Sequence, residues 1–532
     1  MPEPAAWRYQ KITKPMFDLP TPHLVLTGRI LTMAGEVIEN GFVELKDGKI
    51  LALGPLSDLK AGSASVEETG GTVMPGLINS HAHLNWDGIH DLARQSMDDP
   101  RPISAFKAAG NMLKSLRAGV TMVRDLGFHE MNLFSKQAVE QGIFPGPRLK
   151  VCGAAIIQTG GHTYWVCREA SGADEMRRAV REQVRGGADL IKIMACHDTL
   201  EFTDEELGAV IDEAHRNGLP ITAHATYDAC IERVARFGVD CIEHGGSMSD
   251  ATVALLIEKE IPVVTTFAPL VQQSQPEIAR QFGIPEWKIK ERKKAIANPE
   301  RYDGLVRAAR AGVPIVFGTD AGSPAVEHDV IAPGNSLHGE GWCVHRNMDA
   351  LASITIRAAR ISRMEDVVGT LEGGKAADLI VVDGHPDEDL SSLEKVTKTL
   401  LWWSEDARLS LLTSRLAPRI VEEDGAFRPR DAHIAAGLTD VIALGRGDPD
   451  FHTPKHIVEA AKPLSTQTIT TTPAKPGGLE MREAIADNLG RTDSIMGRRN
   501  LVTAGAQEGI CYYAWALFSR ERSSSQTPVH HL

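Results

Sequence analysis

The chain has 532 residues, of which 42% are hydrophobic and 24% charged, a balance that is typical of folded globular proteins and excludes a disordered or fibrous chain. Its formal net charge of −13 argues against a nucleic acid as partner, because a polyanion is repelled by an acidic protein. No stretch offers the roughly 18 uninterrupted apolar residues of a membrane span, and residues 1–17 lack the apolar centre of a signal peptide, so we expect a cytoplasmic protein with no membrane partner.

Short strands and tight turns are predicted over residues 22–75. Apolar residues alternate with polar ones in this stretch, and Gly and Asp-Gly pairs separate the runs. The pattern predicts hairpins of a small β unit, and we assign residues 1–75 to its first part.

The sequence pattern changes at residue 76. From there to residue 364, short apolar runs alternate with segments of helical periodicity. In "DEELGAVIDEAHRNG", for example, apolar residues recur at intervals of three and four, and Gly218 ends the predicted helix. Eight apolar runs qualify as strands: GLINSHAH, VTMVRDLG, RLKVCGAAI, ADLIKIMA, LPITAHA, CIEHGG, IPVVTTF and VPIVFGTD. This alternation predicts an α/β protein built on a parallel (β/α)8 TIM barrel. An open doubly wound sheet is the alternative, but no Gly-rich phosphate-binding fingerprint follows the first strand.

Residues 365–430 again show the pattern of short strands and turns, particularly in "GTLEGGKAADLIVVDGHPDEDL". Because the two ends of a compact domain often lie close together, we expect this stretch to complete the β unit that begins before the barrel. The sequence pattern changes again in residues 431–532, which we predict to be a separate, α-rich appendage.

Six polar side chains fall at the carboxyl ends of the predicted strands, the end at which functional groups gather in a parallel barrel. They are His81, His83, Lys192, His224, His244 and Asp320. Taken alone, each has an ordinary explanation, as a core or surface histidine, a lysine whose stem lies on apolar surface, or an aspartate that caps a helix. Their joint position favours a metal site, and imidazole and carboxylate ligands suit zinc, manganese, cobalt or iron rather than calcium.

Lys192 is the unusual member of this set, because an ammonium group cannot bind a metal ion. Burial beside cations lowers the pKa of a lysine and makes its amine nucleophilic, and such an amine captures carbon dioxide as a carbamate. The carboxylated side chain would be a two-oxygen ligand that bridges two metal ions.

The motifs "MPGLINSHAHL", "TGGH", "ADLIKI", "ITAHA", "IEHGG", "FGTDAG" and "GTLEGGKAADLIVVD" together resemble the amidohydrolase superfamily, and more closely its imidazolonepropionase-like and prolidase-like branch. The resemblance spans residues 22–390. It implies a TIM barrel (76–364) beside a β-sandwich made from both flanks, and one or two divalent metal ions, with two zinc ions as the first expectation and manganese or cobalt as alternatives. By position, His81, His83 and Asp320 would bind one metal, His224 and His244 the other, and carboxylated Lys192 would bridge them.

The reaction implied by this resemblance is hydrolysis of an amide-type C–N bond in a small molecule. Metal ions would activate a water molecule and polarise the substrate carbonyl, while Asp320 would act as general base and then as general acid. A mononuclear deaminase or cyclic-amide hydrolase of the same superfamily is the alternative, against which Lys192 argues. A non-catalytic scaffold that kept the barrel is a third possibility.

Substrate residues are less sharply indicated. His162 in "TGGH", Tyr227 three residues after His224, and His338 in "NSLHGEG" are candidates for substrate contact, and an ordinary role in loop structure is their alternative. The candidate substrates are N-acyl amino acids, dipeptides, carbamates and ureas.

The C-terminal segment carries a second resemblance. "VIALGRGDPDFHTPKHIVEAA", "GLEMREAIADNL" and "LVTAGAQEGI" resemble the first portion of the pyridoxal-phosphate (PLP) dependent aminotransferases, in which the stretch matching Thr503–Gln507 would cradle the cofactor phosphate. The stretches that would supply the Schiff-base lysine and the pyridine-nitrogen aspartate are absent, so we expect no functional PLP. We interpret residues 431–532 as a truncated, non-catalytic segment that offers an assembly surface, and we expect a homo-oligomer.

Overall fold

The computed structural model describes residues 23–331 and 346–401, apart from positions 61, 63, 198 and 299. Three sequence predictions lie outside the described residues: the substrate contact of His338, the part of the 365–430 segment that follows Leu401, and everything predicted for residues 431–532. Within the described ranges, no helix combines the length and the apolar character that crossing a membrane requires.

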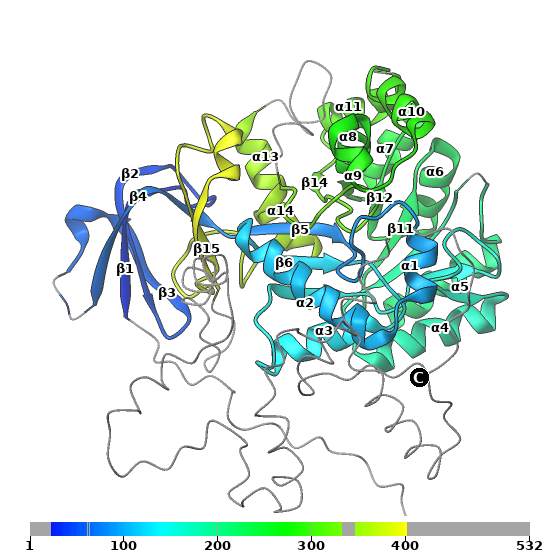
Figure 1. Ribbon diagram of the computed structural model, residues 1–532, viewed down its shortest axis with the longest axis horizontal. Coiled ribbons are helices and arrows are strands. Elements are labelled where there is room, and N and C mark those ends of the chain that lie inside the picture. The colour runs from blue at the N-terminus through cyan, green and yellow to red at the C-terminus, as the bar shows by residue number, and fades with distance from the viewer. Residues whose placement is uncertain are drawn as a thin grey trace, which may run out of the picture. The chain divides into compact units, whose positions relative to one another are not determined.

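Strands from before and after the central α/β part share one six-stranded sheet (Figure 1). At 11 residues, β4 is long enough to pair in parallel with β1 and, along its last four residues, antiparallel with β15. Where the sequence predicts a sandwich of two sheets, the described strands therefore form a single sheet. Its order is β16-β15-β4-β1-β2-β3, with β1 (Leu24–Ile30), β2 (Ile38–Lys46), β3 (Lys49–Pro55), β4 (Ser65–Pro75), β15 (Leu379–Val382) and β16 (Val396–Leu400).

The central part of the chain is an α/β fold with parallel strands in two sheets. One sheet has the order β5-β6-β7 and the other β14-β13-β12-β11-β10-β8-β9. The strands are β5 (Leu77–Ala82), β6 (Val120–Asp125), β7 (Arg148–Val151), β8 (Ile156–Gln158), β9 (Arg168–Ala170), β10 (Ile191–Met194), β11 (Ile221–Ala225), β12 (Cys241–His244), β13 (Val263–Thr265) and β14 (Ile315–Phe317).

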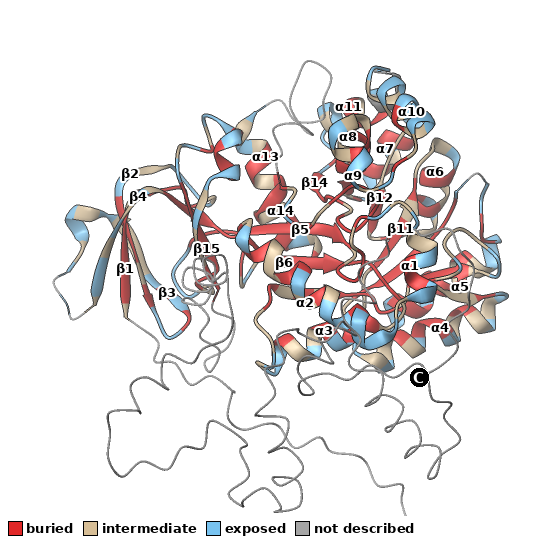
Figure 2. Ribbon diagram, viewed as in Figure 1, coloured by how far each residue is buried: buried red, intermediate tan, exposed pale blue. Residues whose placement is uncertain are grey.

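Helices alternate with these strands along the chain and lie around them in Figure 1. Figure 2 shows β5 and β6 buried along their whole length, while the helices expose one side and bury the other, as amphipathic helices packed on a sheet do. The helices are α1 (Leu92–Asp98), α2 (Arg101–Arg117), α3 (Met131–Glu140), α4 (Ala173–Gly186), α5 (Asp204–Arg216), α6 (Asp228–Phe237), α7 (Asp250–Glu258), α8 (Ala268–Ser274), α9 (Pro276–Gln281), α10 (Glu286–Ile296), α11 (Glu300–Ala311), α13 (Asn347–Ile354) and α14 (Ile356–Ile361).

All eight predicted strands are present, and the helix predicted before Gly218 is confirmed as α5. The strands β8 and β9, however, are additional to the predicted eight. The predicted run "RLKVCGAAI" is interrupted at Gly153, whose φ of +70° turns the chain after β7. The chain then adds β8 and β9 at the edge of the larger sheet, on the loop that carries His162.

Backbone hydrogen bonds connect the two parallel sheets at both edges of the smaller sheet. Beyond β14, the Asp320 N–H donates to His81 O (2.8 Å), and the His83 N–H donates to Ala321 O (2.8 Å). On the other side, the Asp189 N–H, just before β10, donates to Val151 O at the end of β7 (2.8 Å). The carboxyl ends of β14 and β5 therefore lie next to each other, which brings the last predicted site residue beside the first two.

Candidate metal centre

Two histidines project from the carboxyl end of β5. His81 and His83 are separated by one residue, so their side chains point to the same side of the extended chain, and their ring centroids are 5.4 Å apart. Asp320, just beyond β14, places its Oδ1 at 3.5 Å from His81 Nε2 and at 3.4 Å from His83 Nε2. One ligand atom from each of these three residues lies within 4.8 Å of the other two, an arrangement that can hold a metal ion.

Hydrogen bonds on the far side of each ring fix which nitrogen faces Asp320. The Nδ1 of His83 lies 2.7 Å from the carbonyl oxygen of Gly127, which only accepts, so this nitrogen carries the hydrogen and donates it. The Nδ1 of His81 lies 2.7 Å from the Glu243 carboxylate, which accepts in the same way. Both Nε2 lone pairs are thereby directed toward Asp320, the tautomer that metal-binding histidines require.

Glu243 is fully buried beneath the site and is held by three donors. Its Oε1 accepts from Arg124 Nη1 at 2.7 Å and from Thr222 Oγ1 at 2.5 Å, and its Oε2 accepts from His81. Burial alone would raise the pKa of Glu243, but the charge of Arg124 and the hydrogen bond from His81 outweigh it and hold the pKa well below its usual range. A buried carboxylate therefore supports His81 from behind.

The other three predicted side chains come from neighbouring strands of the larger sheet. His244 ends β12, and its ring centroid lies 4.7 Å from that of His81 and 4.5 Å from that of His224 on β11. Lys192 on β10 is only 2% exposed, and burial lowers its pKa in spite of the negative charges of Glu243 and Asp320. A buried lysine with a lowered pKa thus lies beside a group of imidazoles.

All six predicted side chains line one cavity of about 240 Å³. It opens at the carboxyl ends of the parallel strands, where Trp86 and Trp165, with ring centroids 5.8 Å apart, form part of its apolar wall. The six side chains that the sequence places at strand ends therefore come together in the structure. They are His81, His83, Lys192, His224, His244 and Asp320.

Two of these residues have unusual backbone conformations. His244 has a φ of +72° and Asp320 a φ of +58°, in the left-handed region that residues with a Cβ avoid. The cost is about 1 kcal/mol or more for each residue, and such outliers cluster at functional sites. Both turn the chain sharply at a strand end.

The substrate candidates lie close to this cavity. His162 lines it, stacks on His197 with ring centroids 4.0 Å apart, and lies 5.7 Å from the ring of His224. Tyr227 instead lines a neighbouring cavity of about 500 Å³, whose walls also include His224, His244 and Asp320. Burial raises the pKa of Tyr227 to about 12, so its hydroxyl stays protonated and can donate.

Sequence reasoning did not identify Glu243 and Arg124 as parts of the site. Glu243 directly precedes His244 in "CIEHGG", and a glutamate next to a predicted ligand at a strand end was the available signal. Arg124 gives no such signal, because a charged residue near the end of an apolar strand is common at the surface. Here it is 3% exposed, and its charge is paired with Glu243.

Comparisons with known proteins agree with this geometry. The sequence profile of the Amidohydrolase family matches residues 72–403. The ochratoxinase of Aspergillus niger is 26% identical over 445 residues, which cover 72% of this chain and 89% of that protein. A 5-methylthioadenosine/S-adenosylhomocysteine deaminase of Symbiobacterium thermophilum is 26% identical over 407 residues, 69% of this chain and 87% of the relative.

A solved structure of a prolidase in complex with N-methylphosphonate-L-proline is 28% identical in sequence and superimposes with a TM-score of 0.64, covering 73% of this chain and 99% of that one. The family profile covers well over half of the present chain, from β4 to just beyond β16. The chain therefore belongs to the amidohydrolase family, as an enzyme that hydrolyses amide-type carbon–nitrogen bonds.

Proposed function

We propose that the protein is a metal-dependent hydrolase of small amides, with its metal ions held by the six side chains that line one cavity at the strand ends. That convergence is the observation that carries the proposal. The donor set fits divalent cations, because His81 and His83 present Nε2 lone pairs beside the Asp320 carboxylate within 4.8 Å. Burial would raise the pKa of Asp320, but the neighbouring His83, His81 and Lys192 outweigh burial and hold the pKa below its usual range, so Asp320 is an anion.

In this proposal His81, His83 and Asp320 would hold one cation and His224 and His244 a second, and carboxylated Lys192 would be a further ligand. Zinc is the first candidate and manganese or cobalt the alternatives, because imidazole and carboxylate ligands suit all three. The buried amine of Lys192, with its lowered pKa, supports the carbamate.

Bound cations would supply Lewis-acid polarisation of the substrate carbonyl and a lowered pKa for water at the site. The protein's own groups handle the proton. The Asp320 carboxylate accepts a proton from the attacking water and delivers it to the leaving nitrogen, first as general base and then as general acid. Trp86 and Trp165 add apolar surface to the wall of this cavity.

The substrate class we propose is N-acyl amino acids, dipeptides, carbamates or ureas. The similarity to a protein called prolidase supports the dipeptides among these classes. His162 is the proposed substrate contact in the cavity and Tyr227 the one in the neighbouring cavity, because both border the imidazole cluster.

A screen of these four substrate classes against zinc-, manganese- and cobalt-loaded enzyme tests the proposal. We expect hydrolysis of at least one class, with two metal ions per chain by elemental analysis. Absence of hydrolysis with every metal and every class would refute the proposal.

A mononuclear deaminase or cyclic-amide hydrolase remains the second candidate, and two observations favour it. Within the described residues, the compact group that can hold a metal comprises His81, His83 and Asp320 alone. In addition, the deaminase of Symbiobacterium thermophilum is among the relatives. One metal ion per chain together with ammonia release from an aminated ring would select this candidate.

Glu243 provides a sharper test of the metal centre. Replacing it with glutamine keeps its size but exchanges an acceptor oxygen for an NH2 group, so the orientation of His81 is no longer held by a carboxylate. We expect the affinity for zinc to fall about 10- to 100-fold, measured by competition with a chelator. Glu213→Gln is the control, since Glu213 is also a buried glutamate but bonds Arg181 and Arg177 instead. Unchanged zinc affinity in Glu243→Gln would contradict the proposed role of His81.

The remaining sequence predictions join this proposal. We propose that the two parallel sheets, tied by the hydrogen bonds at Asp320 and Asp189, are parts of one (β/α)8 barrel over residues 76–364. We also propose the domain boundaries predicted from the sequence, with residues 1–75 and 365–430 as the flanking β unit. Assembly into a homo-oligomer and a cytoplasmic location stay predictions.

A further inference from the structure

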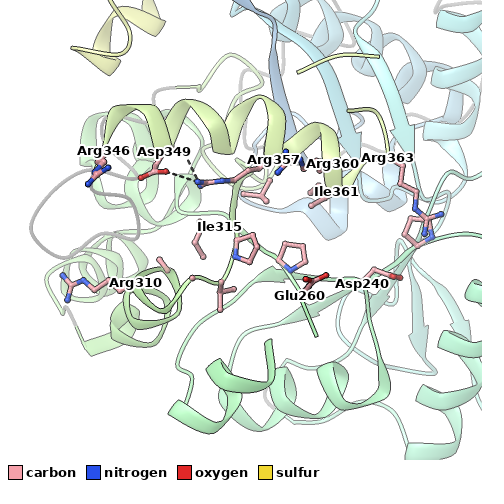
Figure 3. A pocket seen from close by; sticks show the side chains of 17 residues that line it. Asp240, Glu260, Arg310, Ile315, Arg346, Asp349, Arg357, Arg360, Ile361 and Arg363 are labelled. Atoms are coloured by element: carbon pink, nitrogen blue, oxygen red, sulfur yellow. Dashed lines mark hydrogen bonds and ion pairs between the residues drawn. The ribbon is translucent and has the colours of Figure 1, made fainter. Parts of the chain in front are cut away.

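A second cavity, of about 800 Å³, lies at the opposite ends of the parallel strands from the candidate metal centre. Its floor includes Pro220, Asp240, Pro262 and Pro314, each of which immediately precedes one of the strands β11, β12, β13 and β14. The helices α13 and α14 form the facing wall (Figure 3). Its volume falls in the range of roughly 300–1,000 Å³ that is usual for small-molecule sites.

Apolar groups form part of the floor of this cavity, beside Asp240. The three prolines lack backbone N–H donors, and Ile315 and Val316 beside them are buried. Such a surface suits the hydrocarbon or aromatic body of a ligand better than a hydrated ion. Charged groups are placed around it.

The charges around the cavity are unbalanced. Five arginines and three carboxylates line it, an excess of two positive charges, although the whole chain carries a net charge of −13. In Figure 3, Arg357 and Arg360 lie on the helical wall, across the cavity from Glu260 and Asp240. The lining charges are Arg310, Arg346, Arg357, Arg360, Arg363, Asp240, Glu260 and Asp349.

Ion pairs within the protein neutralise only some of the charged side chains around the cavity. Arg357 is paired with Asp349 at 2.9 Å, and Asp240 contacts His215 at 2.9 Å. Arg363 donates from Nη1 to a backbone oxygen, that of Gly218, at 2.8 Å. Neither Arg360 nor Arg363 forms an ion pair with a carboxylate in the part of the chain that the structure describes. Their guanidinium groups are available to an anion.

Backbone conformation supplies an independent observation. The helices α5 and α6 end in Gly218 and Gly238, which adopt left-handed φ values of +75° and +93° at no steric cost. At the ends of α7 and α14 the same conformation is taken by Glu260 (φ +54°) and Arg363 (φ +52°), and both side chains line the cavity. A residue with a Cβ is strained there by about 1 kcal/mol, and at both positions the side chain is a charged one that borders the cavity.

We propose that this cavity binds an organic anion, an apolar body that carries a phosphate or carboxylate group, through the guanidinium groups of Arg360 and Arg363. The guanidinium fork matches both groups by paired, charge-assisted hydrogen bonds. The apolar part of the floor, formed by prolines and branched side chains, receives the body of the ligand. The site is separate from the proposed hydrolytic centre, and its occupancy does not depend on metal ions there.

Isothermal titration calorimetry with the full, metal-loaded chain tests this site. The probes are adenosine monophosphate, a phosphomonoester, and isophthalate, a ring with two carboxylates, since both chelate metal ions weakly. We expect one saturable site per chain with a Kd below about 1 mM for at least one probe. The probe that binds more tightly identifies the preferred anionic group.

Substitutions at the rim separate this cavity from the metal centre. In the double variant Arg360→Gln/Arg363→Asn, binding should weaken at least 10-fold, while kcat/KM for hydrolysis stays unchanged. Asparagine accepts a left-handed φ, so this variant should fold, which a thermal melt verifies. Arg117→Gln, at an exposed position at the end of α2 outside the cavity, should bind like the unmodified chain. The proposal is overturned if the unmodified chain binds neither probe up to about 5 mM, or if the double variant binds as tightly.

Discussion

Replacing Asp320 with asparagine is expected to lower kcat/KM for the best amide substrate by at least about 10³-fold. The substitution preserves the size of the side chain but removes the charge that lies 3.4–3.5 Å from both Nε2 atoms of His81 and His83. It takes away the proton acceptor and one proposed ligand together. Steady-state kinetics and elemental analysis of the same sample measure the two losses.

The control for this variant is Asp98→Asn. Asp98 forms a surface ion pair with Arg94, and each of the two side chains is 64% exposed. Such pairs contribute little to stability, so its kinetics should match those of the unmodified enzyme. An Asp320→Asn enzyme that retains more than a tenth of the original kcat/KM would show that the proton is accepted elsewhere.

Replacing Lys192 with alanine is expected to reduce activity by about 10³-fold and to lower the metal content in the same preparation. The reason is that the proposed carbamate would supply ligand oxygens to the cations. Propionate added at high concentration should restore part of the activity, because its carboxylate fits the space left by the side chain. The restored rate should saturate with propionate.

Lys192→Arg is the matched variant, since it places a long cationic side chain at this position but cannot be carboxylated. It should be as inactive as Lys192→Ala and should not respond to propionate. If either variant keeps full activity and normal metal content, the binuclear proposal is wrong, and one metal at His81, His83 and Asp320 becomes the better description.

The positions of the six candidate ligands could be predicted because two simple regularities govern them. Alternation along an extended strand places His81 and His83 on one side, and the common direction of parallel strands brings their carboxyl ends together. Neither regularity requires knowledge of side-chain packing. The sequence therefore predicted which residues meet, and the structure brings them to one cavity.

Contacts between side chains that are distant in sequence could not be predicted in this way. Glu243 bonds His81 across 162 residues and Arg124 across 119 residues, and no local pattern encodes either pair. The stacking of His162 on His197 depends on the loop that contains β8 and β9, whose strands are too short to stand out as apolar runs. Packing, rather than periodicity, decides such details.

The left-handed backbone at two strand ends constrains any effort to make this enzyme more heat-resistant. Exchanging a left-handed residue for glycine normally relieves steric conflict. At Asp47, in the hairpin turn between β2 and β3, the exchange to glycine removes no residue of the candidate site. At His244 and Asp320 the same exchange would delete the imidazole or the carboxylate that borders the cavity. The backbone strain at these two residues therefore cannot be relieved without loss of a site side chain. Directed evolution for thermostability should therefore accumulate changes in the peripheral turns and leave these two positions untouched.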